Sequence, residues 1–273
     1  MRLSDEQLQR LYVHEGLSTT AIGAQCGYSS ASVLRWLRAA GIVRRDDGGV
    51  QRYARADFSG DACEKAYLVG FRIGDLHVAP QAHSVVIKCT STRPEQIELF
   101  RLLFARYGHV YTDEATMARR RRQTIGMSVW LNRTFDFLLP KEDRVPDWVL
   151  ERDDTFFAFL AGYLDAEGYV NTYLPRGYMT PQVRVEVRSY DYVLLSQLAS
   201  GLNARGIVCP PARLRVKAGY TNKYGVRSNR PLWGLGVCRQ ASLLALFAAI
   251  EPYLRHPRRR RDMQNALTHL LSR

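Results

Sequence analysis

The stretch Leu160-Ala-Gly-Tyr-Leu-Asp-Ala-Glu-Gly168 combines an apolar helical pattern with two small residues and a terminal carboxylate. Gly162 and Ala166 are four positions apart, so they lie on one face of a helix and leave little side-chain bulk there. A second helix can therefore approach this face almost backbone to backbone, as small residues allow between membrane helices. The stretch predicts a closely packed helix that ends on an acid, Glu167.

The same pattern occurs a second time, in Tyr67-Leu-Val-Gly-Phe-Arg-Ile-Gly-Asp-Leu76. Here Gly70 and Gly74 are the small residues and Asp75 is the carboxylate, 92 positions before the second copy (Gly70 to Gly162). For one copy alone, a buried helix with a solvated acid is the simpler explanation, because short motifs arise by chance. Two copies favour a shared function, because internal repetition is harder to obtain by chance.

Pairing of the two predicted helices would bring Asp75 and Glu167 together at their C-terminal ends. Two carboxylates beside the negative ends of two helix dipoles repel each other unless cations neutralise them. Hard divalent cations, Mg²⁺ above all, prefer oxygen ligands of this kind. A metal held by paired carboxylates next to a phosphodiester indicates metal-assisted displacement at phosphorus.

The second stretch closely resembles the signature of the LAGLIDADG homing endonucleases, and the resemblance covers roughly residues 63–273. It implies an endonuclease that cuts both strands of a long DNA site across the minor groove. It also implies that Asp75 and Glu167 are both the catalytic residues and the ligands of Mg²⁺, or of Mn²⁺ or Ca²⁺ in its place. Two motifs in one chain imply a monomer that acts as a pseudo-dimer on double-stranded DNA, with a target that need not be palindromic.

The first motif departs from the family pattern at its end. Leu76 stands where the family usually has glycine, and Ile73 stands where the second motif has Asp165. Gly168 can end its helix in a left-handed cap, whereas Leu76 can adopt that conformation only at a cost. We therefore predict that the two motifs hold their acids differently and that the two DNA strands need not be cut equally fast.

The segments after each motif helix follow the order αββαββα, which is the repeat of this family and predicts the α+β fold class. We place the first repeat at 63–147 and the second at 148–273. In the first, we predict strands at 84–91, 110–111 and 124–131, a helix over 94–107 and another beginning at 135–139. In the second, we predict strands at 169–173, 182–188, 213–217 and 233–238, and helices over 191–205 and 242–254.

One strand, Val183-Arg-Val-Glu-Val-Arg188, alternates between apolar and charged residues. The valines are predicted to face the helices and the charged side chains to form an open face. Such a face suits a saddle on the DNA major groove that contacts phosphates and guanine edges. The predicted DNA-binding residues of the two sheets are Lys88, Thr90, Arg184, Glu186, Arg188, Arg213, Arg215 and Lys217. The family also has a basic residue after the fourth strand, for which the candidates are Arg133 and Arg239.

Residues 1–45 resemble the helix-turn-helix of resolvase tails and bacterial regulators, with a turn at Gly27-Tyr28 and a third helix over 29–38. That helix would enter the major groove and turn Val33, Leu34 and Leu37 to the core. A three-helix domain for protein contacts is the alternative, and the basic residues favour DNA. The predicted DNA-binding residues here are Ser29, Ser30, Ser32, Arg35, Arg38, Arg44 and Arg45. Residues 46–62 are polar and contain glycine, which predicts a linker.

The composition agrees with a nucleic-acid partner. The chain of 273 residues carries a net charge of +13, which favours a polyanion. The five cysteines are scattered without a C-x-x-C pair, which predicts reduced thiols and no disulfide or zinc framework. With no signal peptide and no apolar run of membrane length, we expect a cytoplasmic (nucleoid-associated) or organellar protein.

Two other functions fit the same scaffold. A non-cleaving transcriptional regulator would use it for DNA binding beside the helix-turn-helix, and an RNA maturase would use it on structured RNA. Both acids are retained, which favours the nuclease, because a protein that only binds has no need of a repulsive pair.

Overall fold

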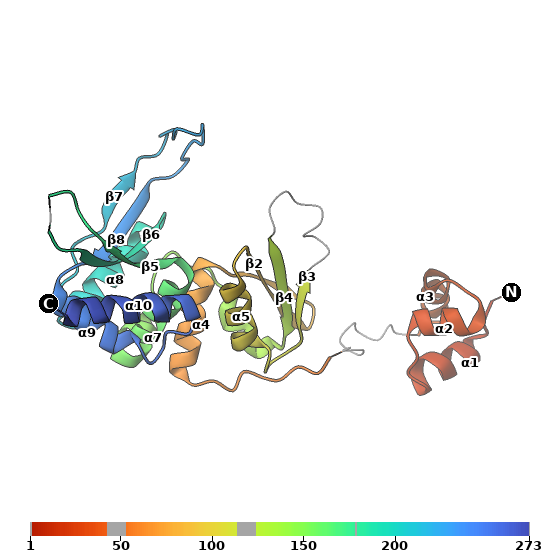
Figure 1. Cartoon of the computed structure of the whole chain (residues 1–273). Coiled ribbons are helices and arrows are strands. Elements are labelled where there is room, and N and C mark those ends of the chain that lie inside the picture. The colour runs from red at the N-terminus through yellow and green to blue at the C-terminus, as the bar shows by residue number, and fades with distance from the viewer. Residues whose placement is uncertain (1, 43–52, 114–123, 178, 273) are drawn as a thin grey trace. The chain divides into compact units, whose positions relative to one another are not determined.

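A computed structural model describes residues 2–42, 53–113, 124–177 and 179–272. The chain divides into two compact units, Met1–Ala54 and Arg55–Arg273 (Figure 1), and each has a hydrophobic core of its own. Within the described ranges, no helix has both the length and the apolarity that crossing a membrane requires.

The first unit is a small bundle of helices. Three serines begin them, because the hydroxyl oxygen of each accepts a hydrogen bond from the backbone N–H three residues later: Ser4, Ser18 and Ser29. The elements are α1 (Asp5–Leu8), which continues as a π-helical turn over Gln9–His14, then α2 (Thr19–Cys26) and α3 (Ser30–Ala39). Their apolar faces bury Leu8, Leu11, Tyr12, Ile22, Val33 and Leu37.

The turn between α2 and α3 depends on two glycines. Gly27 ends α2 in the left-handed region with φ 78°, where a glycine is not strained. Gly23 lies against the backbone of the turn, because a Cβ on it would come within 3.0 Å of the Tyr28 carbonyl oxygen. The predicted core residues Val33 and Leu37 are buried, whereas Leu34 is only half-buried.

The second unit consists of two repeats with the same order of elements, so the predicted α+β fold with two αββαββα repeats is confirmed. Each repeat contains one four-stranded antiparallel sheet, with strand orders β1-β2-β4-β3 and β5-β6-β8-β7. The first repeat comprises α4 (Ala62–Gly74), β1 (His77–Gln81), β2 (Ser84–Ser91), α5 (Pro94–Phe104), β3 (Val110–Asp113), β4 (Ile125–Leu131) and η3 (Arg133–Leu138). The element η3 is a 3₁₀ helix where an α-helix was expected.

A short helix, α6 (Asp147–Leu150), leads into the second repeat. That repeat comprises α7 (Asp153–Glu167), β5 (Gly168–Tyr173), β6 (Gln182–Ser189), α8 (Tyr192–Ala204), β7 (Arg213–Val216), β8 (Leu232–Val237) and α9 (Gln240–Ile250). A final helix, α10 (Pro257–Leu271), contacts α9 and β5 of its own repeat and also α5 of the first.

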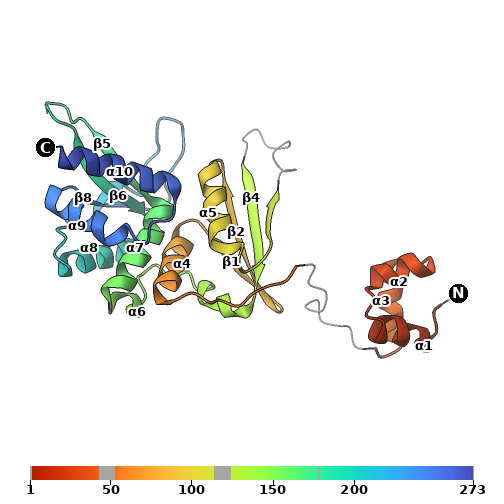
Figure 2. The same ribbon diagram turned by 60° about the horizontal axis from the view of Figure 1, so that its bottom comes forward.

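Helices α4 and α7 lie side by side between the two sheets (Figure 2). Their contact is made by backbone: a Cβ on Gly70 would come within 3.0 Å of the Phe159 carbonyl oxygen, and one on Gly162 within 3.0 Å of the Tyr67 carbonyl oxygen. The small residues therefore permit the close approach that the sequence predicts. Large buried side chains surround the contact, among them Phe71 and the ring of Tyr67.

The predicted difference in helix capping is wrong. Gly168 follows α7 with φ −81° and ψ 163°, which is extended backbone, and Asp75 follows α4 in the right-handed region. The chain passes directly from each helix into an extended strand, so no left-handed reversal is needed. Gly168 is required for space, because a Cβ there would lie 2.8 Å from the Leu164 carbonyl oxygen. Leu76 is accommodated in the core, 2% exposed.

Part of the predicted linker packs on the second unit. The Ala56 N–H donates to the Tyr107 carbonyl oxygen, and the Phe58 ring packs against the rings of Tyr107, Phe135 and Phe137. Residues 43–52, which include the predicted DNA-binding residues Arg44 and Arg45, lie outside the described part of the chain.

Replacing Gly70 or Gly162 by alanine is expected to destabilise the second unit by roughly 1–3 kcal/mol, the usual cost of overpacking. The added Cβ meets backbone atoms, which cannot rotate away, so the two helices must separate. Chemical denaturation measures the effect. The matched control is Gly126→Ala, whose Cβ would find only ordinary contact, 3.7 Å from the Asp113 Cβ. Equal stability of Gly70→Ala and Gly126→Ala would contradict the backbone contact.

Candidate functional site

The two motif acids lie together where α4 and α7 end. Glu167 is the last residue of α7, and Asp75 follows directly on α4. A Cβ on Gly74, next to Asp75, would lie 2.9 Å from the Glu167 Cγ, so the chain beside one acid touches the other acid. Both residues are exposed.

The two acids are close enough to interact electrostatically. Displacement of water by the surrounding protein atoms, together with the Glu167 charge, raises the pKa of Asp75 to about 6. Desolvation likewise raises the pKa of Glu167. Two cations, Lys141 and Arg259, oppose these shifts at both acids. Gln96 contributes as well, because its Nε2 donates to the Asp75 Oδ2 at 2.8 Å.

The ligand chemistry of this pair fits a hard divalent cation. A cation there would remove the repulsion between Asp75 and Glu167, and carboxylate oxygens are the ligands that Mg²⁺ and Ca²⁺ prefer. The described residues contain no group of three or more His, Cys, Asp and Glu side chains that could hold a metal. Two carboxylates fill only some of the coordination positions of such a cation, and water and a phosphate oxygen could take others.

A third acid, Asp165, anchors the site from inside. Its side chain is 1% exposed, and its Oδ2 accepts hydrogen bonds from the Tyr67 hydroxyl at 2.7 Å and from the N–H groups of Arg255 and His256 at 2.8 and 3.0 Å. Burial raises the pKa of Asp165 to about 6. The carboxyl group thus ties α7 to α4 and to the segment that leads into α10.

This anchor positions the start of α10. His256 begins the helix, since its Nδ1 accepts a hydrogen bond from the Arg258 N–H at 3.2 Å, and burial lowers the pKa of His256 to about 4. The imidazole is therefore neutral at physiological pH. Arg259 follows in the first turn, with a buried Nε that has no hydrogen-bond partner.

Three residues of this site were not predicted: Gln96, Lys141 and Arg259. The run Arg258–Arg261 is the one sequence signal that points to Arg259, and nothing local marks the other two. Of the two candidates for the auxiliary base, Arg133 pairs with Asp136 at 2.7 Å, and Arg239 is exposed at the start of α9.

Six of the eight sheet residues that were predicted to bind DNA belong to the second repeat. Arg188, Arg213, Arg215 and Lys217 are exposed and Arg184 is half-buried. Glu186, which was predicted to face DNA with them, is only 2% exposed and forms ion pairs with Arg184, Arg188 and Arg215. On the first sheet, Lys88 and Thr90 are exposed.

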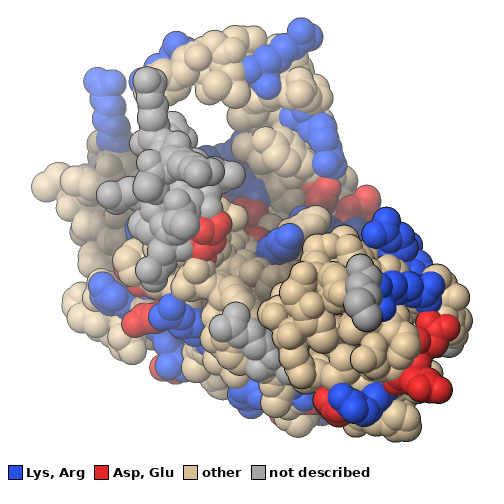
Figure 3. Space-filling model, turned by 90° about the vertical axis from the view of Figure 1, so that its right-hand side faces the viewer, with Lys and Arg blue, Asp and Glu red and all other residues tan. Residues whose placement is uncertain are grey.

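In the first unit, the predicted residues of α3 differ in their surroundings. Ser29 and Ser32 begin the helix together: the Ser32 N–H donates to the Ser29 Oγ at 3.2 Å, and the two hydroxyls lie 3.0 Å apart. Ser30, Arg35 and Arg38 are exposed. In Figure 3, Lys and Arg side chains (blue) and Asp and Glu side chains (red) are both seen at the surface.

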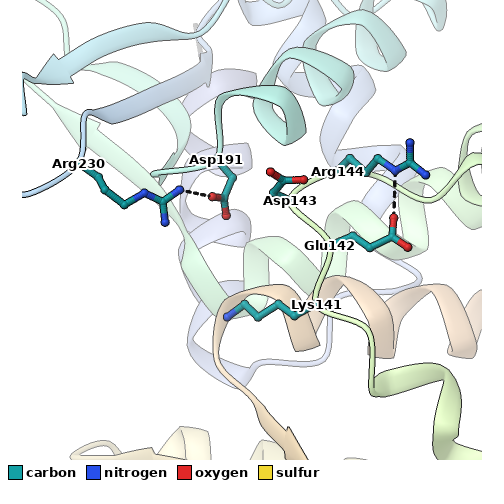
Figure 4. Close-up of a pocket in the computed structure, with 6 residues that line it drawn as sticks. All are labelled: Lys141, Glu142, Asp143, Arg144, Asp191 and Arg230. Atoms are coloured by element: carbon teal, nitrogen blue, oxygen red, sulfur yellow. Dashed lines mark hydrogen bonds and ion pairs between the residues drawn. The ribbon is translucent and has the colours of Figure 1, made fainter.

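A pocket of about 480 Å³ lies where the connection between the repeats passes the start of α8 (Figure 4). Arg230 donates to Asp191 at 2.9 Å, and the Arg144 Nε donates to Glu142 at 3.0 Å. In Figure 4 the Lys141 side chain extends away from the second of these pairs. The residues that line the pocket are Lys141, Glu142, Asp143, Arg144, Asp191 and Arg230.

No protein-family model matches the chain, and no curated protein matches its sequence. Similar solved structures include the LAGLIDADG homing endonuclease I-GzeII with its DNA target (10% identity, TM-score 0.46, covering 76% of this chain and 91% of that one). Another is I-SmaMI bound to uncleavable DNA (10% identity, TM-score 0.47, covering 77% of this chain and 91% of that one). A third is I-DmoI in complex with DNA and Mn (15% identity, TM-score 0.44, covering 69% of this chain and 96% of that one).

In the absence of metal, Asp75→Asn is expected to stabilise the protein at pH 7.5 by roughly 1 kcal/mol. The folded protein raises the pKa of Asp75 from 3.8 to about 6, so ionisation costs stability as the pH rises through that window. The figure is well below the full value of the shift, because water screens an exposed carboxylate. The gain should disappear below about pH 4, where the acid is protonated in both states.

Thermal unfolding in EDTA between pH 4 and 8 measures this difference. Glu98→Gln, at an exposed position of α5, is the control for the loss of one negative charge. A variant at Asp75 that is no more stable than wild type at pH 7.5 would show that the folded protein does not raise the pKa of this acid.

Proposed function

We propose that the protein is a site-specific endonuclease that hydrolyses double-stranded DNA with a divalent metal ion held by Asp75 and Glu167. One observation carries the proposal: a backbone-to-backbone contact between α4 and α7 forces two carboxylates together at the joint of two similar repeats. A protein that only binds DNA gains nothing from this repulsion. A metal-dependent enzyme needs both carboxylates as ligands, and the bound cation relieves their repulsion.

The chain's own residues would prepare the site for a phosphodiester. Gln96 orients the Asp75 carboxylate through its hydrogen bond. Lys141 and Arg259 add positive charge beside the two acids, where a phosphate backbone would approach. Bound Mg²⁺, or Mn²⁺ or Ca²⁺, would lower the pKa of a coordinated water and stabilise negative charge at phosphorus and on the leaving oxygen.

The two sheets would bind the DNA on either side of this joint. Their open faces carry the exposed basic residues, and guanidinium groups contact both phosphates and guanine edges. Because the two repeats belong to one chain and differ in sequence, a monomer could bind a long target that is not palindromic. In the first unit, α3 presents Arg35 and Arg38 to solvent as a recognition helix would.

With Mg²⁺ and a library of duplex sites, the protein is expected to cut both strands of its target. Asp75→Asn and Glu167→Gln should each reduce the cleavage rate by about a hundredfold or more, since each removes a charge that holds the metal. Both should keep affinity for the target, because neither residue is on a sheet face. Glu98→Gln should cleave as wild type does.

Tight, sequence-specific binding without cleavage in any divalent metal would refute the nuclease and support a regulator. Binding of structured RNA in preference to duplex DNA would support the maturase. Both results can be read from gel shifts and cleavage gels with the full chain.

The first unit is expected to contribute to DNA affinity but not to cleavage. Arg35→Ala should weaken binding of the target about tenfold at moderate salt, because it removes a contact to DNA, while the rate at saturating protein stays unchanged. Arg10→Ala is the matched control, since Arg10 lies on another helix of the same unit and pairs with Glu15. If Arg35→Ala binds as tightly as Arg10→Ala, α3 is not a recognition helix.

A further inference from the structure

One buried carboxylate gathers three arginines on the open face of the second sheet. The Glu186 Oε1 lies 2.9 Å from the Arg188 Nε and 3.2 Å from the Arg215 Nη2, and its Oε2 lies 3.4 Å from the Arg184 Nη1. The Glu186 side chain is 2% exposed, while those of Arg184, Arg188 and Arg215 are 34%, 51% and 35% exposed. The acid is therefore covered by the guanidinium groups, which themselves reach solvent.

Two glycines of β8 make room for this cluster. Glu186 lies opposite Gly236 and Arg188 opposite Gly234 in the ladder between β6 and β8. A Cβ on Gly234 would lie 2.6 Å from the Arg215 Nε, so the Arg215 side chain crosses the sheet directly over that glycine. Because these glycines have no side chain, the Arg215 side chain can lie flat across the strands instead of extending into water.

Two tyrosines of β5 hold the cluster from the other side. The Arg188 Nη2 donates to the Tyr169 hydroxyl at 2.9 Å, and the Arg184 Nη2 donates to the Tyr173 hydroxyl at 3.0 Å. A guanidinium has five N–H donors. Because Glu186 and the tyrosines use only some of them, each arginine keeps donors for a ligand above the sheet.

The cluster belongs to one repeat. The position of Glu186 in the ladder, between Tyr169 and Gly236, corresponds to that of Lys88 between His77 and Ser128 in the first sheet. A lysine there cannot collect arginines. The two open faces therefore present different chemistry to a ligand that spans both.

A purely stabilising role does not account for the arrangement. Ion pairs of exposed arginines contribute little to stability, and three arginines around one acid leave a net charge of +2. A fixed group of guanidinium donors instead suits a rigid, electron-rich partner, because the side chains lose little freedom on binding. Guanine offers such acceptors, O6 and N7, in the major groove.

We propose that Glu186 is a positioning residue that sets DNA specificity, and that through it the second sheet reads guanines in one half of the target. The inference rests on the proposed function, namely that the second unit binds duplex DNA. Glu186 itself contacts no base. It holds Arg184, Arg188 and Arg215 in place, so that their remaining donors meet guanine edges instead of ranging over phosphates.

The test begins with selection of sites from a randomised duplex library by the full chain, with Ca²⁺ present. Wild type is expected to enrich guanines in one half of the selected site. Glu186→Gln should lower the ratio of affinities for a selected and a scrambled duplex at least about tenfold. Its affinity should also depend more steeply on salt, because released arginines then contact phosphates.

Glu151→Gln is the matched control, because it changes the net charge equally at an exposed position outside the sheets. Its affinity ratio should stay within about twofold of wild type. A ratio for Glu186→Gln within the same range would overturn the inference and leave the proposed function intact, as would selected sites without guanine preference in either half. Enrichment of no sequence at all would overturn both.

Arg215→Ala gives a second, independent measurement should Glu186→Gln fold poorly. It removes one arm of the cluster at a partly exposed position. Guanine preference should relax at one position of the selected site, with an affinity loss of about tenfold for that site. Unchanged preference at every position would count against guanine reading by this sheet.

Discussion

The contact between the backbones of α4 and α7 determines where everything else in the second unit lies. Because Gly70 and Gly162 each meet a carbonyl oxygen of the other helix, the helices cannot slide or rotate without a clash or a void. This fixes the two repeats relative to each other. It also fixes the ends of the helices, and therefore the two acids, at one place. Packing and electrostatics are coupled here, since the geometry that is favourable for the glycines is unfavourable for Asp75 and Glu167.

Two cations of the site, Lys141 and Arg259, offset the unfavourable proximity of the two carboxylates. Lys141 comes from the connection between the repeats and Arg259 from the last helix, so the cations that act on the acids belong to segments far from both motifs. Asp165 brings the last helix there through two backbone N–H groups. A buried acid that accepts three hydrogen bonds is stable only while all of its partners remain in place, and this makes the end of α7 and the start of α10 one cooperative element.

The sequence predicted what depends on short-range periodicity. The alternation of valines on β6 and the four-residue spacing of small residues were sufficient to predict the sheet faces and the helix contact, because both patterns follow directly from strand and helix geometry. The cap at Gly168 was predicted wrongly, since the same residue can supply either a left-handed φ or an absent Cβ, and only the path of the following strand decides between them. Gln96 and Lys141 could not be predicted, because their proximity to the acids arises from tertiary packing and leaves no local signal. The run Arg258–Arg261 marks Arg259 as basic, but only tertiary packing selects it among the four arginines. Glu186 was placed on the correct face, but its burial depends on arginines and glycines of neighbouring strands.

The two repeats share the same backbone fold but differ in the side chains beside the paired acids and on the open faces of the sheets. The strand orders are the same in both sheets, yet Asp165 has its counterpart in Ile73, and Glu186 has its counterpart in Lys88. A symmetric dimer of identical subunits could not hold such differences, because every residue would occur twice in equivalent surroundings. Joining the repeats in one chain removes that constraint. Each half is free to acquire its own anchors and its own open face, while the glycine contact at the centre keeps the acids paired.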